Sequence, residues 1–184
     1  MKNAEELLHA SVWGPSLTSE EMAKALAGTF ERSFAPGAFI CMKGEPVDYW
    51  MGIVDGLGKM ASHWTTGKTT SLTGISTGGW FGEGSLLKSE PRRYDVMALR
   101  ETRVAFMSRA TFLWLLDHSI PFNRYMIAQL NERLGQFIGM IENERMLDTD
   151  ARIARGLAAL FNPVLYPGTN RLLQISQEEL GYLA

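Results

Sequence analysis

Cysteine is nearly absent from this sequence, and its scarcity excludes several kinds of protein. The one residue, Cys41, rules out an internal disulfide framework, so a reducing cytoplasm is the expected compartment. One thiol also cannot ligate an iron–sulfur cluster, which needs several cysteines. Because Cys41 lies in a predicted strand, we interpret it as a small core residue rather than a redox sensor.

Long apolar runs are also lacking, and none approaches the roughly 20 residues that a membrane-spanning helix needs. The start, MKNAEELLHA, is polar and lacks the apolar core of a signal peptide. His9, His63 and His118 are far apart with no ligand spacing, so we expect no metal or haem site. Nothing resembles a nucleophile–base pair, and we therefore expect no catalytic residues and no enzyme activity.

A strong excess of either charge is missing too, because 18 Lys and Arg oppose 20 Asp and Glu, for a net charge of -2. This balance argues against a basic nucleic-acid surface over the whole chain but leaves a local basic patch open. A hydrophobic content of 46% and a charged content of 21% are typical of a soluble globular protein. The length of 184 residues suffices for one full domain and a smaller one.

The chain changes its hydrophobic period twice. Residues 1–32 have a helical pattern, in which Thr18 and Glu21 form a capping box and Phe30 continues the apolar face. From Ser33 the period becomes two, which predicts short strands. Turn signals at regular spacing favour an antiparallel sandwich or barrel. These signals are Pro36-Gly37, Gly44-Glu45-Pro46, Asp55-Gly56, Thr66-Gly67-Lys68 and Thr77-Gly78-Gly79.

Helical pattern resumes at Ala110, and Ser119-Ile120-Pro121 marks the start of a new helix. Over Asn123–Leu147 five apolar residues have the a/d spacing of a coiled-coil seam, which predicts a dimer interface. A buried core helix is the alternative. A second apolar line on this helix, which includes Met126 and Met140, would pack on the chain's own body. The seam consists of Ile127, Leu130, Leu134, Phe137 and Ile141.

Two further helices are predicted after the long one. Asp148 offers a cap for the first, and Asn162-Pro163 ends it. Ser176 and Glu179 form a second capping box, which opens a final helix.

The stretch whose residues could bind a ligand is Gly78–Leu87, which leaves a strand through glycines and can open a short helix. Backbone N–H groups bared at such a turn can bind an anion, and Glu83 could accept hydrogen bonds from sugar hydroxyls. Arg93, ten residues after Glu83, could pair with a phosphate. The alternative is a glycine-rich corner in which Arg93 bridges to Glu83 or Glu90. Spacing alone favours this structural alternative, because surface arginines and glycine turns are common.

These features together resemble the Crp/Fnr family of bacterial transcription regulators. The most specific parts are Phe81-Gly82-Glu83 with Arg93, the Gly44…Gly56 strand pair and the run Ile175–Gly181. The resemblance implies an α+β fold. Residues 1–121 would form an antiparallel β-roll, a cyclic-nucleotide-binding-like jelly roll. A dimerisation helix at 122–148 and a truncated winged helix-turn-helix domain at 149–184 would follow.

The same resemblance implies a dimeric DNA-binding regulator that senses a small anionic or nucleotide-like effector through its roll. The effector-binding residues would be Gly82, Glu83, Gly84, Arg93 and Tyr94. Ser176 and Gln177 would contact DNA. The recognition helix is expected beyond Ala184, so the complete C-terminal domain would bind double-stranded DNA, and RNA polymerase would be a further partner.

Departures from the family pattern indicate that the effector is not cyclic AMP. Family members that bind it follow the arginine with Ser or Thr and then Ala, whereas this chain has Tyr94 and Asp95. Ile138 and Gly139 stand where base-reading polar residues are usual. The alternative is a module that binds cyclic AMP or cyclic GMP despite Tyr94. A sugar- or small-molecule-binding enzyme on a β-barrel is disfavoured, because no acid/base pair or metal triad is present.

Overall fold

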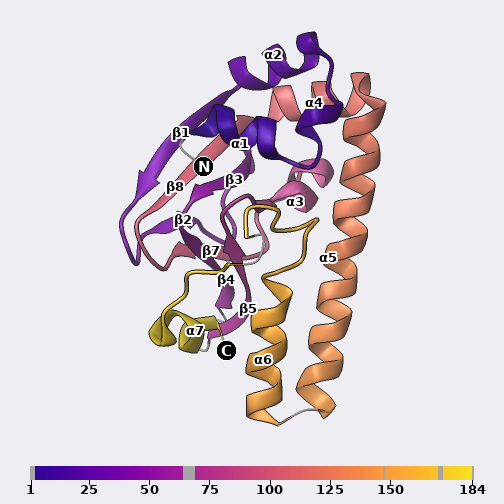
Figure 1. The fold of residues 1–184 in the computed structure, drawn as a ribbon. Coiled ribbons are helices and arrows are strands. Elements are labelled where there is room, and N and C mark those ends of the chain that lie inside the picture. The colour runs from indigo at the N-terminus through magenta and orange to yellow at the C-terminus, as the bar shows by residue number, and fades with distance from the viewer. Residues whose placement is uncertain (1–2, 64–68, 147, 170–171, 184) are drawn as a thin grey trace.

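The computed structural model describes all residues except 1–2, 64–68, 147, 170–171 and 184 (Figure 1). Its centre is a β-roll of two four-stranded antiparallel sheets, counted over the described residues, which confirms the predicted sandwich. One sheet has the order β1 (Thr29–Phe34), β8 (Thr102–Ser108), β3 (Tyr49–Asp55) and β6 (Trp80–Phe81). The other has the order β2 (Phe39–Cys41), β7 (Asp95–Ala98), β4 (Leu57–His63) and β5 (Thr69–Ser76).

The turn at Asp55-Gly56 shows why glycine is needed at one of the predicted corners. Gly56 has a φ of +115°, and a Cβ there would lie 2.5 Å from the Thr102 hydroxyl oxygen. A side chain at this position would therefore be strained by both the backbone conformation and the contact. The glycine lets β3 turn directly into β4 and join the two sheets.

The N-terminal helices α1 (Ala4–Ala10), η1 (Gly14–Ser16) and α2 (Ser19–Ala27) gather at one end of the roll beside α4 (Arg109–His118) (Figure 1). The capping box of Thr18 and Glu21 is confirmed. The predicted extension of helix to residue 32 is wrong. Gly28 ends α2, and Phe30 lies in β1, where its ring stacks on that of Phe106 at 5.3 Å. The backbone of residues 29–34 pairs with β8, and this strand pairing determines the structure more strongly than the short helical spacing of the sequence.

Two buried apolar clusters hold the roll together. The first joins the N-terminal helices, β3 and the start of the long helix through Trp13, Trp50 and Trp80, whose rings are in contact. The second lies between the sheets. Its members include residues from the segment after α6, namely Leu160, Leu165 and Tyr166. Each fully buried large side chain contributes roughly 1.5–3 kcal/mol.

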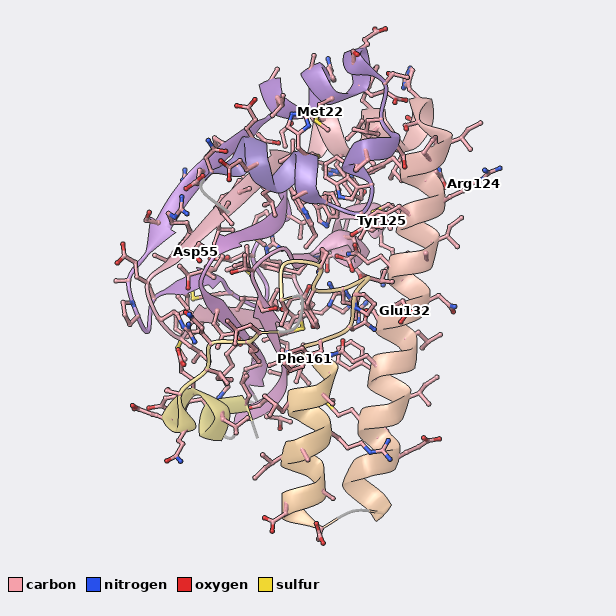
Figure 2. The ribbon with its side chains drawn as sticks, in the orientation of Figure 1. Met22, Asp55, Arg124, Tyr125, Glu132 and Phe161 are labelled. Atoms are coloured by element: carbon pink, nitrogen blue, oxygen red, sulfur yellow. The ribbon has the colours of Figure 1, made fainter. Side chains whose placement is uncertain are left out.

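The long helix α5 (Ile120–Met146) runs along the roll, and α6 (Thr149–Ala159) returns beside it (Figure 1). The predicted start at Ser119-Ile120-Pro121 and the Asp148 cap are confirmed. The predicted end at Leu147 lies outside the described residues. Figure 2 shows Tyr125 on the roll side of α5 and Arg124 on the outer side. The last helix, α7 (Gln177–Leu183), rests beside β4 and β5.

No helix in the described part of the chain is long and apolar enough to cross a membrane.

Candidate effector site

The candidate site begins where β6 ends and the short helix α3 (Glu83–Lys88) starts, as the glycine pattern predicts. Gly82 caps α3 with a left-handed φ of +96°. A Cβ at Gly82 would lie 2.9 Å from a guanidinium nitrogen of Arg92. A Cβ at Gly84 would meet no atom within 4 Å, so the backbone there is open. The glycines therefore bring the backbone against an arginine and leave space beside it.

The arginine at this corner is Arg92, one residue before the Arg93 predicted from the sequence. Its exposed fraction is only 6%. Its Nη2 donates to the carbonyl oxygen of Tyr49 at 3.2 Å and lies 4.0 Å from the sulfur of Met51. Both partners are neutral, and a buried charge with neutral partners is costly.

Arg93 is not beside Glu83 in the structure. Its side chain is exposed and donates to Glu90 twice, at 2.9 and 2.7 Å. These hydrogen bonds, together with one from Lys88, lower the pKa of Glu90 to about 2. Backbone hydrogen bonds from Gly44 to Arg92 and from Arg92 to Glu45 fix the local chain so that Arg92 faces inward. The Glu90 bridge is the structural alternative that the spacing favoured.

Glu83 contacts the long helix α5 rather than Arg93. Its carboxylate is 2% exposed and accepts a hydrogen bond from Arg133 Nε at 2.7 Å. The carbonyl oxygen of Trp80 accepts hydrogen bonds from Arg133 Nη2 and, at 3.4 Å, from Gln129. Burial would lower the pKa of Arg133, but the facing Glu83 carboxylate raises it, and the net direction is upward. The sequence signal for this contact is a line of polar residues on the roll side of α5, Gln129, Arg133 and Gln136.

Tyr94 is partly buried near Glu83, Arg133 and Arg92, and its contact with an effector stays a prediction. Its ring packs against the cluster between the sheets. Burial and then the Glu83 carboxylate raise the pKa of its phenol. Asp95, which departs from the family pattern, accepts a hydrogen bond from the backbone N–H of Lys43 at 2.8 Å. The structure therefore places Gly82, Glu83, Gly84 and Tyr94 near Arg92 and Arg133, while Arg93 lies outside.

The segment after α6 contributes Tyr166 to the inside of the roll. This side chain is 1% exposed, and a Cβ at Gly79 would lie 2.9 Å from its ring. Thr169 and Ser76 share a hydrogen bond of 2.7 Å that fixes the same segment. Glu83 and Tyr166 both act to raise the pKa of Arg133. Glu83 Oε2, Arg133 Nη1 and Tyr166 Oη are each buried without a hydrogen-bond partner among the described residues.

Four of the five predicted seam residues lie on the exposed side of α5. Ile127 is 64% exposed and Leu134 is 58% exposed. Phe137 is half-buried and packs on the cluster between the sheets, so it faces the roll rather than the seam. Ile138 is exposed in its place. We call the exposed residues the apolar stripe: Ile120, Ile127, Leu130, Leu134, Ile138 and Ile141.

Ser176 and Gln177 are exposed at the start of α7. The capping box is confirmed, because the Ser176 hydroxyl accepts from the Glu179 N–H at 3.2 Å and Glu179 accepts from the Ser176 N–H at 2.8 Å. Glu179 also accepts two hydrogen bonds of 2.7 Å from Arg100 of the roll. Contact of Ser176 and Gln177 with DNA stays a prediction. Within the described residues, no group of three or more His, Cys, Asp or Glu could hold a metal ion.

The β-roll is similar to known proteins. Residues 31–119 match the family model described as cyclic nucleotide-binding domain. Over 140 residues the chain is 31% identical to the cAMP-dependent protein kinase type II regulatory subunit of Drosophila melanogaster. That region is 76% of this chain and 36% of the Drosophila protein, so the chain spans about a third of the length of this relative.

Solved structures show the same fold. The sensor domain of the transcriptional regulator DNR from Pseudomonas aeruginosa has a TM-score of 0.64 at 20% identity, covering 73% of this chain and 91% of that one. The Thermus thermophilus catabolite activator protein has a TM-score of 0.62 at 24% identity, covering 96% and 79%. The first of these neighbours is described as a transcriptional regulator. The β-roll thus has the cyclic nucleotide-binding fold, and the similar proteins are regulatory proteins rather than enzymes.

Proposed function

We propose that this chain is the sensing part of a dimeric DNA-binding transcription regulator of the Crp/Fnr type, whose effector is a small nucleotide-like anion. The observation that carries the proposal is the buried Arg92 guanidinium, which has neutral partners and lies against Gly82. An anion at this corner would pair with Arg92 and accept hydrogen bonds from the backbone around Gly82–Gly84.

Hydroxyl recognition is assigned to Glu83 and Tyr94. The free lone pairs of Glu83 Oε2 suit a ligand hydroxyl, and Arg133 Nη1 suits a ligand acceptor. Because Glu83 is already paired with Arg133, an effector that binds Glu83 also alters the contact between α3 and α5. Effector binding would therefore bias the position of the long helix relative to the roll.

Dimerisation is assigned to the apolar stripe of α5. Its members Ile120, Ile127, Leu134 and Ile141 recur every seven residues, which is the spacing of a two-helix seam. A seam made of one repeated surface is self-complementary and fits a two-fold symmetric dimer. The complete protein would then bind a two-fold symmetric DNA site through both C-terminal domains, and the family resemblance adds RNA polymerase as a partner.

Cyclic AMP is not the effector that we propose. Ile138 belongs to the exposed stripe and Gly139 has no side chain, so neither can donate to a base inside its own roll. Tyr166 also occupies space beside Gly79 at the end of β5. The alternative function, binding of cyclic AMP or cyclic GMP, is favoured by the family match of residues 31–119 and by Gln136, a polar residue on the roll side of α5.

A nucleotide panel tests the proposal and separates it from the alternative. Cyclic AMP, cyclic GMP, AMP and GMP are titrated calorimetrically into the wild type and into the Arg92→Gln and Arg93→Gln variants. A non-cyclic nucleotide of the panel, AMP or GMP, should bind the wild type and Arg93→Gln. Its affinity should fall about 10- to 100-fold in Arg92→Gln, because a charge-assisted hydrogen bond is lost.

Arg93→Gln is the matched control, since it removes an adjacent arginine that lies outside the site. A clear micromolar isotherm with cyclic AMP or cyclic GMP would replace the proposal by its alternative. If the panel gives no binding, or if Arg93→Gln rather than Arg92→Gln abolishes it, the assignment of the site is wrong.

A further inference from the structure

The turn after α3 places a serine in a backbone conformation that suits glycine. Ser89 ends α3 with a φ of +54° and is the one residue other than glycine with a positive φ in the described part of the chain. A Cβ is unfavourable in this left-handed region, so glycine would be the less strained residue at this position. A serine there indicates that its hydroxyl is used. The other positive-φ residues are Gly37, Gly44, Gly56, Gly78 and Gly82.

The hydroxyl of Ser89 contacts the guanidinium of Arg109, which is the first residue of α4. Arg109 Nη2 donates a hydrogen bond to Ser89 Oγ, which is a neutral acceptor. The Nε atom of Arg109 is buried and donates to no group among the described residues. An arginine carries five N–H donors in a planar fork that matches the oxygens of a phosphate. The guanidinium therefore has a spare donor beside an exposed hydroxyl.

The side chains around Ser89 are mainly basic. Lys88 and Arg93 both pair with the Glu90 carboxylate, at 2.6 and 2.7 Å, and are 60% and 68% exposed. Together with Arg109 they outnumber the Glu90 carboxylate, and this balance favours an added anion at the turn. Ser89 itself is exposed, so an enzyme can reach its hydroxyl.

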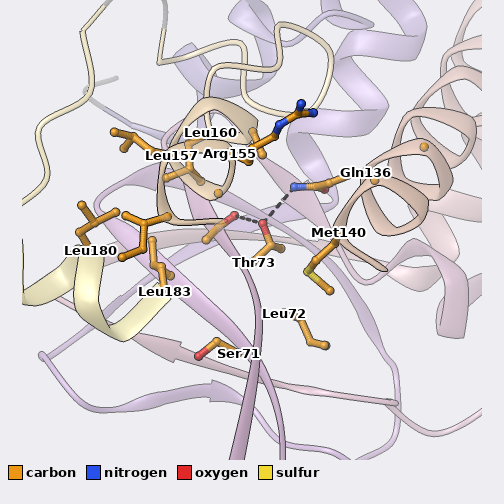
Figure 3. A pocket seen from close by; sticks show the side chains of 16 residues that line it. Ser71, Leu72, Thr73, Gln136, Met140, Arg155, Leu157, Leu160, Leu180 and Leu183 are labelled. Atoms are coloured by element: carbon orange, nitrogen blue, oxygen red, sulfur yellow. Dashed lines mark hydrogen bonds between the residues drawn. The ribbon is translucent and has the colours of Figure 1, made fainter. Parts of the chain in front are cut away.

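This turn is separate from the sites at the other end of α3 and on the far side of the roll. Glu83, the first residue of α3, contacts α5. In the pocket between β5 and the C-terminal helices, Gln136 donates to Thr73 (Figure 3), and neither Ser89 nor Arg109 lines that pocket. A change at Ser89 therefore acts first on the contact between α3 and α4 and requires no effector.

We propose that Ser89 is a phosphorylation site and that Arg109 binds the phosphate. The Ser89 hydroxyl oxygen forms a bond to the γ-phosphorus of a nucleoside triphosphate, the bond from that phosphorus to the bridging oxygen breaks, and a nucleoside diphosphate leaves. The hydroxyl proton passes to a base of the protein kinase that catalyses the transfer. Because Lys88 precedes the site and Arg93 follows it, both exposed, the kinase is one with an acidic substrate groove. The phosphate then joins the end of α3 to the start of α4.

Phosphate mapping tests the modification itself. The protein is isolated from its own cells in exponential and in stationary phase, and mass spectrometry assigns phosphate to single residues. We expect phosphate on Ser89 of the wild type and its loss in Ser89→Gly, which suits the left-handed backbone and should stay folded by circular dichroism. Ser16, an exposed serine of η1, is the internal control. The proposal is overturned if Ser89 carries no phosphate in either phase, or no more than Ser16.

A second experiment tests Arg109 as the phosphate-binding residue. Phosphoserine is inserted at position 89 during translation, and phosphorus NMR follows its titration. The guanidinium should hold the second pKa of this phosphate about 1 pH unit below that of phosphoserine inserted at Ser16. Arg109→Gln should abolish the difference. Arg124→Gln removes an exposed guanidinium on the outer side of α5 (Figure 2) and should preserve it. Equal pKa values at the two positions, or a difference that survives Arg109→Gln, would overturn the assignment of Arg109.

Discussion

Two adjacent arginines of this protein lie in opposite environments. Arg92 is buried beside Gly82, and Arg93 is exposed and paired with Glu90. Sequence spacing pointed to Arg93, because it counts residues from Glu83 and carries no information on which side chain turns inward. The deciding contacts are the backbone hydrogen bonds between Arg92 and the Gly44-Glu45 turn, which is about fifty residues away in the chain. A long-range contact of this kind cannot be predicted from the local pattern of the sequence.

Cys41 provides a pH-dependent prediction at the scale of a single residue. Burial raises the pKa of its thiol from 9.0 to about 11, with a smaller opposing effect from Arg92. The folded state thus favours the neutral thiol. This contribution to stability is complete below pH 9 and is lost as the pH rises toward 11.

We therefore expect the free energy of unfolding of the wild type to fall by about 2–3 kcal/mol relative to Cys41→Ala across this interval. Denaturant titration at several pH values measures the difference. Iodoacetamide should also modify the native thiol much more slowly than the unfolded one. Equal alkylation rates in the two states would show that Cys41 is accessible, contrary to its burial.

The long helix α5 has three different faces. One carries Gln129 and Arg133 toward the roll, one carries Gly135 and Gly139 toward α6, and one is the apolar stripe. The sequence predicted the helix and four exposed apolar positions along it, because helical spacing is a local property, and dimerisation through them stays a prediction. It assigned Phe137 both to the seam and to the line that faces the chain's own body, and tertiary packing decides for the second. The same limit explains Phe30, whose partner Phe106 is distant in sequence.

Leu134→Asp tests the seam. A charge buried at the centre of the apolar stripe in both copies should raise the dimer dissociation constant at least about a hundredfold. Sedimentation velocity should then show monomers. Ala128→Asp adds the same charge to an exposed position of α5 outside the stripe and should leave the dimer intact. An unchanged dimer in Leu134→Asp would place the interface elsewhere.

At the scale of the whole molecule, α7 is held against the roll by Arg100. Its guanidinium binds both carboxylate oxygens of Glu179 and the carbonyl of Gln174, each at 2.7 Å. Burial would raise the pKa of Glu179, but hydrogen bonds from Ser176 and Arg100 lower it overall. The pair therefore stabilises docking above the unfolded pKa of Glu179 and is lost as the pH falls through the lowered one. No local pattern foretold this contact, which links residues 79 apart.

Arg100→Gln should release α7 from the roll. Losing a two-point ion pair of this exposure costs about 1 kcal/mol, so hydrogen exchange over 177–183 should accelerate about fivefold. Exchange in β3 and β8 should not change. Arg93→Gln removes an exposed ion pair of the roll and serves as the control. Unaltered exchange at α7 in Arg100→Gln would show that apolar packing alone holds the helix.

The insertion of Tyr166 among Gly79, Glu83 and Arg133 has a kinetic consequence for the proposed regulator. An effector that binds the polar groups beside the Tyr166 ring would do so only after the segment that carries Tyr166 has moved away. The observed association rate would then level off at high effector concentration, at the rate of segment departure, instead of rising to the diffusional range. The apparent affinity would also be reduced by the fraction of time for which the segment is in place. The rate of the response would thus depend on the departure of the Tyr166 segment, and the affinity of Arg92 for the ligand would not change that rate.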